Sequence, residues 1–433
     1  MSTDVHEPPP DAVAQADAAA AESARLAAPE VIADSLGEYA KIWLKRVRNG
    51  ESGALPVTLG LIAIVIYFQV RNSLFLSAGN LVNLLVQGAP FILFGMAEVY
   101  VLLLGEIDLS IGYSGAIGAT VTAWVAYSAP WWVAILAGLA STTVAGAVLG
   151  IIITRLSLPS FVVTLAGFLG FEGLLLQLIP HTGHGAGGTI SIPSSIIDDL
   201  TSGTLTPAVG WIVMVAIVAV SGLSMFLRDR RRRASKLVTP PVSITLLKVG
   251  VMAAAGVVVV LVSNVNRGTV TTSLRGLPWV VLVVLGMLVL WTALLGRTRF
   301  GRYIYAIGGN AEAARRAGVN ISLIRTLAFT LCGLTAGVAG IIYASRLGSS
   351  STDVDGGQLV LFAVAAAVIG GTHLFGGRGK MIHAVLGGLV VAAIYNGLYL
   401  VGLSAPATDI VTALVLLAAV TVDSLARRGQ STG

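Results

Sequence analysis

Long apolar stretches recur along almost the whole chain, and they constrain its fold more than any other feature. A run of about 18 or more apolar residues is long enough to cross the hydrocarbon layer of a membrane as an α-helix. Hydrophobic residues make up 55% of the chain and charged residues only 11%, which is more apolar surface than a soluble core hides. We therefore expect an all-α polytopic membrane protein of about twelve transmembrane helices. The candidate spans are 55–70, 81–105, 111–128, 131–153, 160–179, 207–227, 244–263, 278–295, 322–343, 357–375, 381–400 and 408–425.

The positions of Lys and Arg predict how these spans are oriented. Short loops rich in Lys and Arg stay on the cytoplasmic side of a membrane. If the N-terminus lies in the cytoplasm, 21 of the 27 Lys and Arg residues fall in cytoplasmic segments. Because the number of spans is even, both termini are then cytoplasmic. This orientation accounts for the net charge of +6, so the charge does not indicate nucleic-acid binding.

Residues outside the predicted transmembrane domain, 55–428, form short segments of different character. Residues 1–36 are Ala-rich and acidic and predict a disordered cytoplasmic tail. Residues 37–54 begin with apolar and basic residues at helical spacing, which is typical of an amphipathic juxtamembrane helix on the inner leaflet or of a plain membrane anchor. Residues 429–433 are a short C-terminal tail.

One charged segment, residues 297–318, separates two strongly apolar stretches and predicts a docking site for a partner; we call it the docking loop. Gly308 and Gly309 open a short Ala-rich helix, for which Asn310 is a suitable N-cap and Glu312 lies in the first turn. A helix this short frays alone in water, so we expect a cytoplasmic protein to hold it. The residues assigned to the docking site are Gly301, Arg302, Gly308, Gly309, Asn310, Glu312, Arg315, Arg316 and Gly318.

A second polar segment, GEIDLSIG at residues 105–112, interrupts two apolar runs with two carboxylates. Acidic groups at membrane depth are costly unless they are paired or hydrated. Asp108 and Ser110 are positioned to cap the following helix, which would satisfy backbone amides that lipid cannot. The alternative is direct contact of this segment with substrate or with an ATPase.

Other polar residues within the spans are few, and each is a candidate for a translocation pathway. The alternative is that they satisfy neighbouring helices. Small-residue patterns at Gly146–Gly150 and Gly333–Gly340 predict close helix packing instead. The pathway candidates are Glu98, Glu106, Asp108, Ser110, Glu172, Asn83, Gln87 and Asn396.

The chain carries no pattern typical of an enzyme or of a resident cofactor. His373 and His383 have no carboxylate at ligand spacing, so we expect no metal site. The Gly-rich segment 370–380 differs from a phosphate-binding loop because Met381 follows Lys380 where Ser or Thr is required. If transport uses ATP, the ATP and its Mg²⁺ are bound by another polypeptide.

Several motifs together resemble the permease subunits of ribose/xylose-type ABC sugar importers, most of all the D-xylose branch. They occur in the order found in that family and cover the chain from about residue 75 to 428. The motifs are GEIDLSIG at 105–112, PSFVVTLAG at 159–167, GRYIYAIGGNAEAAR at 301–315, IGGT at 369–372 and the pair Asn396–Gly397.

The resemblance implies a binding-protein-dependent ABC importer permease fold that is not itself an enzyme. It implies a homodimer in the bacterial cytoplasmic membrane, an ATPase chain with two nucleotide-binding cassettes, and an extracytoplasmic sugar-binding protein. Residues 308–318 would be the loop that couples ATP hydrolysis to transport, and the cargo would be D-xylose or another pentose. The alternative that we keep is an ion-coupled secondary sugar transporter that uses Glu98, Glu106, Asp108 and Glu172.

Overall fold

The computed structural model describes residues 55–235, 241–268, 273–404, 406–414 and 417. The predicted tail at 1–36, the amphipathic helix at 37–54 and the C-terminal tail at 429–433 lie outside these residues. The described residues divide into two compact units, one from the stretch 214–256 and the other from the stretches 55–213 and 257–417. The second unit contains all of the predicted site residues and is called the main unit below.

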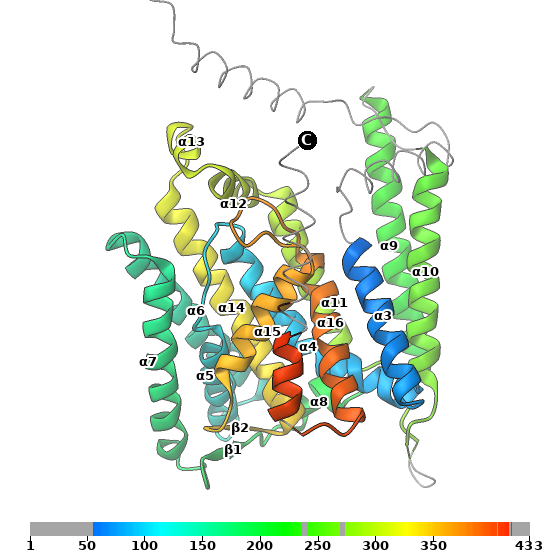
Figure 1. Ribbon diagram of the computed structural model, residues 1–433, viewed down its shortest axis with the longest axis horizontal. Coiled ribbons are helices and arrows are strands. Elements are labelled where there is room, and N and C mark those ends of the chain that lie inside the picture. Colours follow the sequence, from blue (N-terminus) through cyan, green and yellow to red (C-terminus); the bar gives the residue numbers. More distant parts are fainter. Residues whose placement is uncertain (1–54, 236–240, 269–272, 405, 415–416, 418–433) are drawn as a thin grey trace, which may run out of the picture. The chain divides into compact units, whose positions relative to one another are not determined.

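Helices dominate the described part of the chain, as the apolar pattern predicts (Figure 1). Eight of them are long and apolar enough to cross a membrane: α4 (Ala78–Leu102), α6 (Trp131–Arg155), α7 (Ser160–His181), α9 (Pro207–Ala234), α10 (Val242–Asn264), α11 (Trp279–Arg297), α14 (Ile321–Leu347) and α16 (Met381–Leu400). Three shorter helices also coincide with expected spans: α3 (Leu55–Arg71), α5 (Ile111–Val125) and α15 (Gly356–Ile369).

One difference from the predicted spans lies in the C-terminal third. Helix α15 ends at Ile369, although the apolar pattern continues to 375. Its end is followed by glycines with left-handed backbone, Gly371 at φ 111° and Gly376 at φ 89°, and this conformation cannot continue a right-handed helix. Residues 406–414 are helical, and most of the last predicted span, 408–425, lies outside the described residues.

Helix α14 lies at the centre of the main unit and packs against α4, α5 and α6, while α4 also packs against α15 and α16. Glycines let α6 and α14 approach with their backbones in contact. A Cβ atom on Gly146 would lie 2.3 Å from the carbonyl oxygen of Phe329, and one on Gly333 would lie 2.3 Å from that of Thr142. Small residues in membrane helices permit this approach, and the predicted close packing at these glycines is confirmed.

The main unit has two distinct ends (Figure 1). One end carries the short helices α12 (Arg299–Gly309) and α13 (Ala311–Arg316), together with the loops at 103–110 and 370–380. The other end carries α8 (Ser195–Ser202) and the antiparallel pair β1 (Thr189–Ser191) and β2 (Ser349–Ser351), in which Ile190 is opposite Ser350. The sequence-based orientation predicts that the first of these ends faces the cytoplasm.

The other unit contains most of α9 and α10, which pack on each other at small residues. A Cβ on Gly222 would contact Val249, and one on Gly256 would contact Met214. Near one end of the pair, the hydroxyl of Thr245 donates a 2.7 Å hydrogen bond to the buried Asp229 carboxylate. Many large apolar side chains of the pair are exposed, as expected for a surface in contact with lipid.

Candidate functional site

The docking loop consists of two consecutive helices where the sequence predicts one. The side chain of Thr298 accepts a hydrogen bond from the Gly301 amide and caps α12. Gly308 and Gly309 are the last residues of α12 and do not open the next helix, so this part of the prediction is wrong. The sequence contains a signal for α12, because apolar residues within 299–309 recur at helical spacing. The prediction did not include this helix.

Helix α13 has the local chemistry that the sequence predicts. The Asn310 side chain accepts a 2.9 Å hydrogen bond from the Ala313 amide, which is an N-cap. Glu312 forms ion pairs of 3.3 Å with both Arg315 and Arg316. Gly318, at φ 82°, ends the segment. All three charged side chains are exposed, so α13 offers a charged surface to a partner.

The docking loop is attached to the membrane-embedded helices through Gly308. A Cβ on Gly308 would lie 1.9 Å from the carbonyl oxygen of Leu103 and 2.5 Å from the amide nitrogen of Gly377. The Gly377 amide itself donates a 2.9 Å bond to that Leu103 carbonyl, and the Tyr305 hydroxyl donates one of 2.8 Å to the Gly379 carbonyl. The end of α12 is therefore held against the end of α4 and the 370–380 loop.

Two other residues assigned to the docking loop have different surroundings. Gly301 is buried at the junction of α11 and α12, where a Cβ would lie 1.9 Å from the Leu295 carbonyl oxygen. Arg302 is exposed on α12. Gly301 thus serves the turn between the helices, while Arg302 belongs to the surface.

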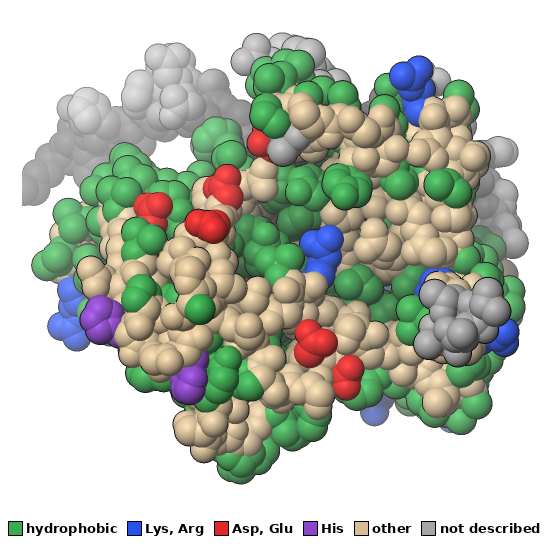
Figure 2. Space-filling model, turned by 90° about the horizontal axis from the view of Figure 1, so that it is seen from below, with side chains coloured by type: hydrophobic (Ala, Val, Ile, Leu, Met, Phe, Trp, Pro, Cys, Tyr) green, Lys and Arg blue, Asp and Glu red, His purple; other side chains and the backbone are tan. Residues whose placement is uncertain are grey.

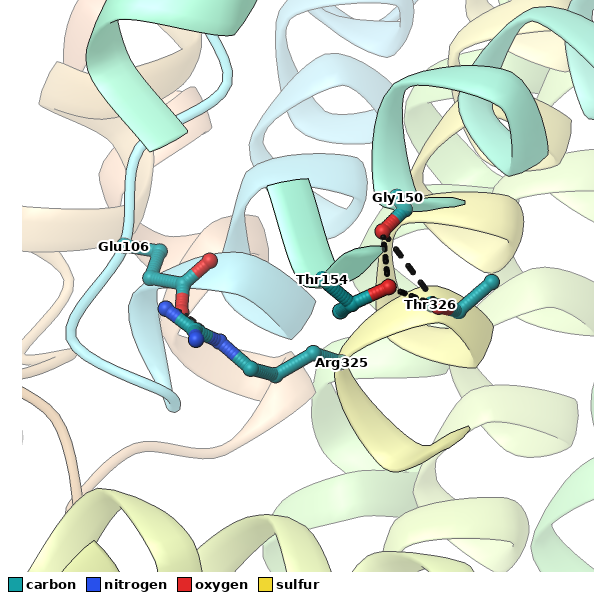
Figure 3. Close-up of polar contacts among 5 residues, drawn as sticks. All are labelled: Glu106, Gly150, Thr154, Arg325 and Thr326. Atoms are coloured by element: carbon teal, nitrogen blue, oxygen red, sulfur yellow. Dashed lines mark hydrogen bonds and ion pairs between the residues drawn. The ribbon is translucent and has the colours of Figure 1, made fainter. Parts of the chain in front are cut away.

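The acidic loop, residues 103–110, lies at the same end of the main unit. Glu106 is buried and pairs with Arg325, which extends from the second turn of α14 toward the loop (Figure 3). Burial raises the pKa of the Glu106 carboxyl and the neighbouring guanidinium lowers it, with a net upward direction. The ion pair therefore offsets part of the cost of burying the carboxylate. The sequence did not reveal Arg325 as the partner.

Next to this ion pair, threonine hydroxyls link α14 to the end of α6 through hydrogen bonds (Figure 3). The Thr154 hydroxyl donates a 2.8 Å bond to the Gly150 carbonyl and lies 3.2 Å from the Thr326 hydroxyl. Because Thr326 follows Arg325 directly, the same turn of α14 contacts both the acidic loop and α6.

Asp108 and Glu98 are both fully enclosed and organise the start of α5. Asp108 accepts bonds from the Ser110 amide at 2.9 Å and the Ser110 hydroxyl at 2.6 Å. Glu98, on α4, accepts a 3.2 Å bond from the Asp108 amide. Asp108 binds the amide and hydroxyl of Ser110 just before α5, and the Ser110 side chain makes no cap bond, so the predicted capping of an α5 amide is not found. This geometry supports the structural alternative for the segment.

Amide side chains form a second group, between α4 and α16. Asn396 donates hydrogen bonds of 3.0 Å to Asn80 and 3.2 Å to Gln87, and it accepts one of 2.8 Å from Asn80. Gln87 and Asn396 are buried, while the candidate Asn83 is exposed. Asn80, which is one turn from Asn83 on α4, was not among the predicted residues.

Glu172 lies apart from both groups. It accepts a 2.9 Å bond from the Tyr113 hydroxyl and so links α7 to α5. Apart from the exposed Asn83, the predicted pathway residues are therefore divided among three places: the acidic loop with the adjoining Glu98, the amide cluster and the α5–α7 contact. Within the described residues, no group of His, Cys, Asp and Glu is arranged to hold a metal ion.

The main unit also contains a cavity that none of the predicted pathway residues line; we call it the serine cavity. Its volume is about 210 Å³. It opens at the end that carries β1 and β2, the end seen in Figure 2, where acidic side chains lie among hydrophobic ones. The sequence signal for this cavity is the polar run at 349–355, which lies between two apolar helices. No residue of this run was among the predicted site residues. The lining residues include Phe94, Tyr343, Ser349, Ser350, Ser351 and Asp353.

Comparison with known proteins agrees with the resemblance seen in the motifs. Residues 80–420 match the family described as branched-chain amino acid transport system / permease component. The chain is 34% identical over 374 residues to the xylose transport system permease protein of Escherichia coli strain K12, which covers 85% of this chain and 91% of that protein. The xylose transport system permease protein of Haemophilus influenzae is 32% identical over 380 residues, or 86% of this chain and 96% of that protein.

A ribose transporter is similar as well. The ribose import permease protein of Escherichia coli strain K12 is 30% identical over 387 residues, or 89% of this chain and 96% of that protein. No solved structure matches the chain. With its membrane-spanning helices, the chain therefore belongs to the ribose/xylose-type permeases of ABC sugar transporters, which are multi-pass proteins of the bacterial cytoplasmic membrane.

Proposed function

We propose that this chain is the permease subunit of an ATP-driven importer that carries a monosaccharide inward across the cytoplasmic membrane. The first choice of cargo is D-xylose or another pentose, because the relatives named above are permeases for xylose and ribose. Two copies of the chain form the channel, and a separate ATPase with two nucleotide-binding cassettes docks on residues 297–318. An extracytoplasmic sugar-binding protein delivers the cargo at the opposite end.

The observation that carries this proposal is the attachment of an exposed, charged helix to the membrane core. Helix α13 offers its charges outward, and α12 contacts the end of α4 through Gly308. Helix α4 in turn packs on α14, α15 and α16. A displacement of the docking loop by an ATPase is therefore transmitted to four helices of the main unit. If the ATPase prefers one arrangement of these helices, ATP binding shifts the population between inward-open and outward-open states.

An ion-coupled transporter is less well supported by the same geometry. Glu106 is paired with Arg325, Asp108 with Ser110, and Glu172 with Tyr113. Glu106 and Asp108 share the acidic loop, whereas Glu172 lies at the α5–α7 contact, so these acids do not form one continuous path. An ATP-independent mechanism would also leave the exposed helix α13 without a role.

The test is a charge swap within α13. Glu312→Arg combined with Arg316→Glu keeps an i,i+4 ion pair but places like charges at positions 312 and 315, so the cost to α13 is about 1 kcal/mol. A docking ATPase, however, meets the reversed charges. We expect the swapped chain to insert and to unfold near the wild-type temperature, but to lose co-purification with the ATPase and ATP-driven uptake of D-xylose in proteoliposomes.

The matched control replaces both residues by Ala, which removes the charges without reversing them. We expect the control to dock more weakly than the wild type and more strongly than the swap. Normal ATPase binding and uptake by the charge-swapped chain would refute docking on this helix.

A further inference from the structure

The serine cavity exists because the helices around it present small side chains. Ala116 and Ala119 of α5 and Gly340 and Ala344 of α14 all line it. At its deep end, α5 and α14 are in backbone contact, because a Cβ on Gly340 would lie 2.0 Å from the Gly115 carbonyl oxygen. From Gly340 to Leu347, both of which line the cavity, the axis of α14 rises about 10 Å. The cavity thus penetrates well below the surface of this end.

The deep wall is apolar and aromatic. Phe94 of α4 is fully buried, and its ring would be 2.8 Å from a Cβ on Gly115. The Phe94 ring therefore packs against α5 at the point where α5 contacts α14. Tyr343, half-buried on α14, and Leu359 of α15 complete this side of the lining.

The mouth of the cavity is rich in hydroxyl and carboxylate groups whose backbone is held in place. Strand β2 contributes three consecutive serines, and its pairing with β1 fixes their positions. The buried Ser350 hydroxyl is 2.9 Å from that of Thr120, which ties the strand to α5. Asp353 is exposed beside the serines.

We propose that the serine cavity is a binding site for one monosaccharide ring in each copy of the permease; this inference rests on the proposed function as a sugar importer. A sugar has hydroxyls that both donate and accept hydrogen bonds, and C–H faces that are apolar. The mouth supplies Ser and Asp oxygens as partners, and the deep wall supplies aromatic and alanine surface. Small-molecule sites combine a mostly apolar lining with a few convergent polar groups in this way.

The size of the cavity restricts the class of ligand. Its volume of about 210 Å³ is below the roughly 300–1,000 Å³ typical of sites for drug-sized ligands. A single pentose ring suits this volume, whereas a disaccharide does not. The cavity lies within one chain, so the site does not require groups from a second copy.

Protection of an introduced thiol tests the site. The chain has one cysteine, Cys332, which is fully buried and gives little background labelling. Ser349→Cys places a thiol at the cavity mouth, and Ser128→Cys places an exposed one at the same end but outside the cavity. The full-length variants are labelled in right-side-out vesicles with a membrane-impermeant maleimide, without the sugar-binding protein, in buffer, D-xylose or sucrose.

We expect D-xylose at about ten times its Kd to slow labelling of Ser349→Cys about tenfold. Sucrose should have no effect, and neither sugar should change labelling of Ser128→Cys. Adding Ala344→Leu, which fills the cavity, should abolish the protection. The matched Ala140→Leu, on the exposed face of α6, should preserve it and shows that a larger side chain is tolerated in the assay.

Two results separate the possible failures. If the assembled importer takes up D-xylose but D-xylose does not protect Ser349→Cys, the cavity is not a sugar site and the proposed function stands. If the assembled importer takes up no pentose with ATP, the proposed cargo class is wrong, and the inference about the cavity falls with it.

Discussion

Alanine at position 308 should loosen the docking loop from the membrane core. A Cβ there would lie 1.9 Å from the Leu103 carbonyl oxygen and 2.5 Å from the Gly377 amide nitrogen. Both neighbours are backbone atoms, and the 2.9 Å hydrogen bond between them holds them in place. Overpacking of this kind costs about 1–3 kcal/mol. Because Ala is also a better helix former than Gly by roughly 0.5–1 kcal/mol, we expect a net loss of about 1–2 kcal/mol.

The adjacent glycine provides the control. A Cβ on Gly309 would meet nothing within 4 Å, so Gly309→Ala should leave the fold unchanged or slightly more stable. For Gly308→Ala, we expect Tm in detergent, measured at one scan rate, to fall by roughly 2–4 °C. ATP-driven uptake should fall with it, because α12 no longer transmits movement to α4. Equal Tm values for the two alanine variants would refute the argument from close contact.

Three further predictions concern contacts between helices. Arg325→Met should destabilise the chain by about 1–3 kcal/mol, which is less than for a fully buried pair because the Arg325 side chain is 32% exposed. Adding Glu106→Gln should restore part of the lost Tm, and no recovery would contradict the ion pair. Gly146→Val should separate α6 from α14 and lower Tm, whereas Gly170→Val, which meets nothing within 4 Å, should not; an equal effect of the two would count against backbone contact. Asn396→Leu should cost about 0.5–2 kcal/mol, since it leaves buried amides without partners, and Tm in a double-mutant cycle with Gln87→Leu should show coupling if the cluster is real.

The docking site illustrates how far local sequence reasoning reaches. The cap at Asn310, the pairing of Glu312 with two arginines and the terminating Gly318 depend on residues within one or two turns. Such features were predictable because the interacting groups are neighbours in the chain. The role of Gly308 was not, since the backbone that it meets belongs to residues 103 and 377.

The pathway candidates show where local sequence reasoning fails. Their residue types marked them as unusual in a membrane, but their partners are remote in sequence. Arg325 meets Glu106 across 219 positions, and Asn396 meets Asn80 across 316. Asn83 is the same residue type on the same helix as Asn80, but it is exposed. Which amide turns inward depends on the rotation of α4 against α16, and no local pattern contains this information.

The sequence by itself determined the helical spans, the ends of most helices and the family. A backbone in lipid must satisfy its hydrogen bonds within each segment, so apolar length is sufficient to locate a helix. The tertiary structure alone decided which polar groups of different helices pair, where Gly308 meets α4 and that small residues on α5 and α14 leave a cavity below the serines of β2. These features arise from distances between helices that are far apart in the chain, and such distances are set by packing of the whole bundle and not by any one segment.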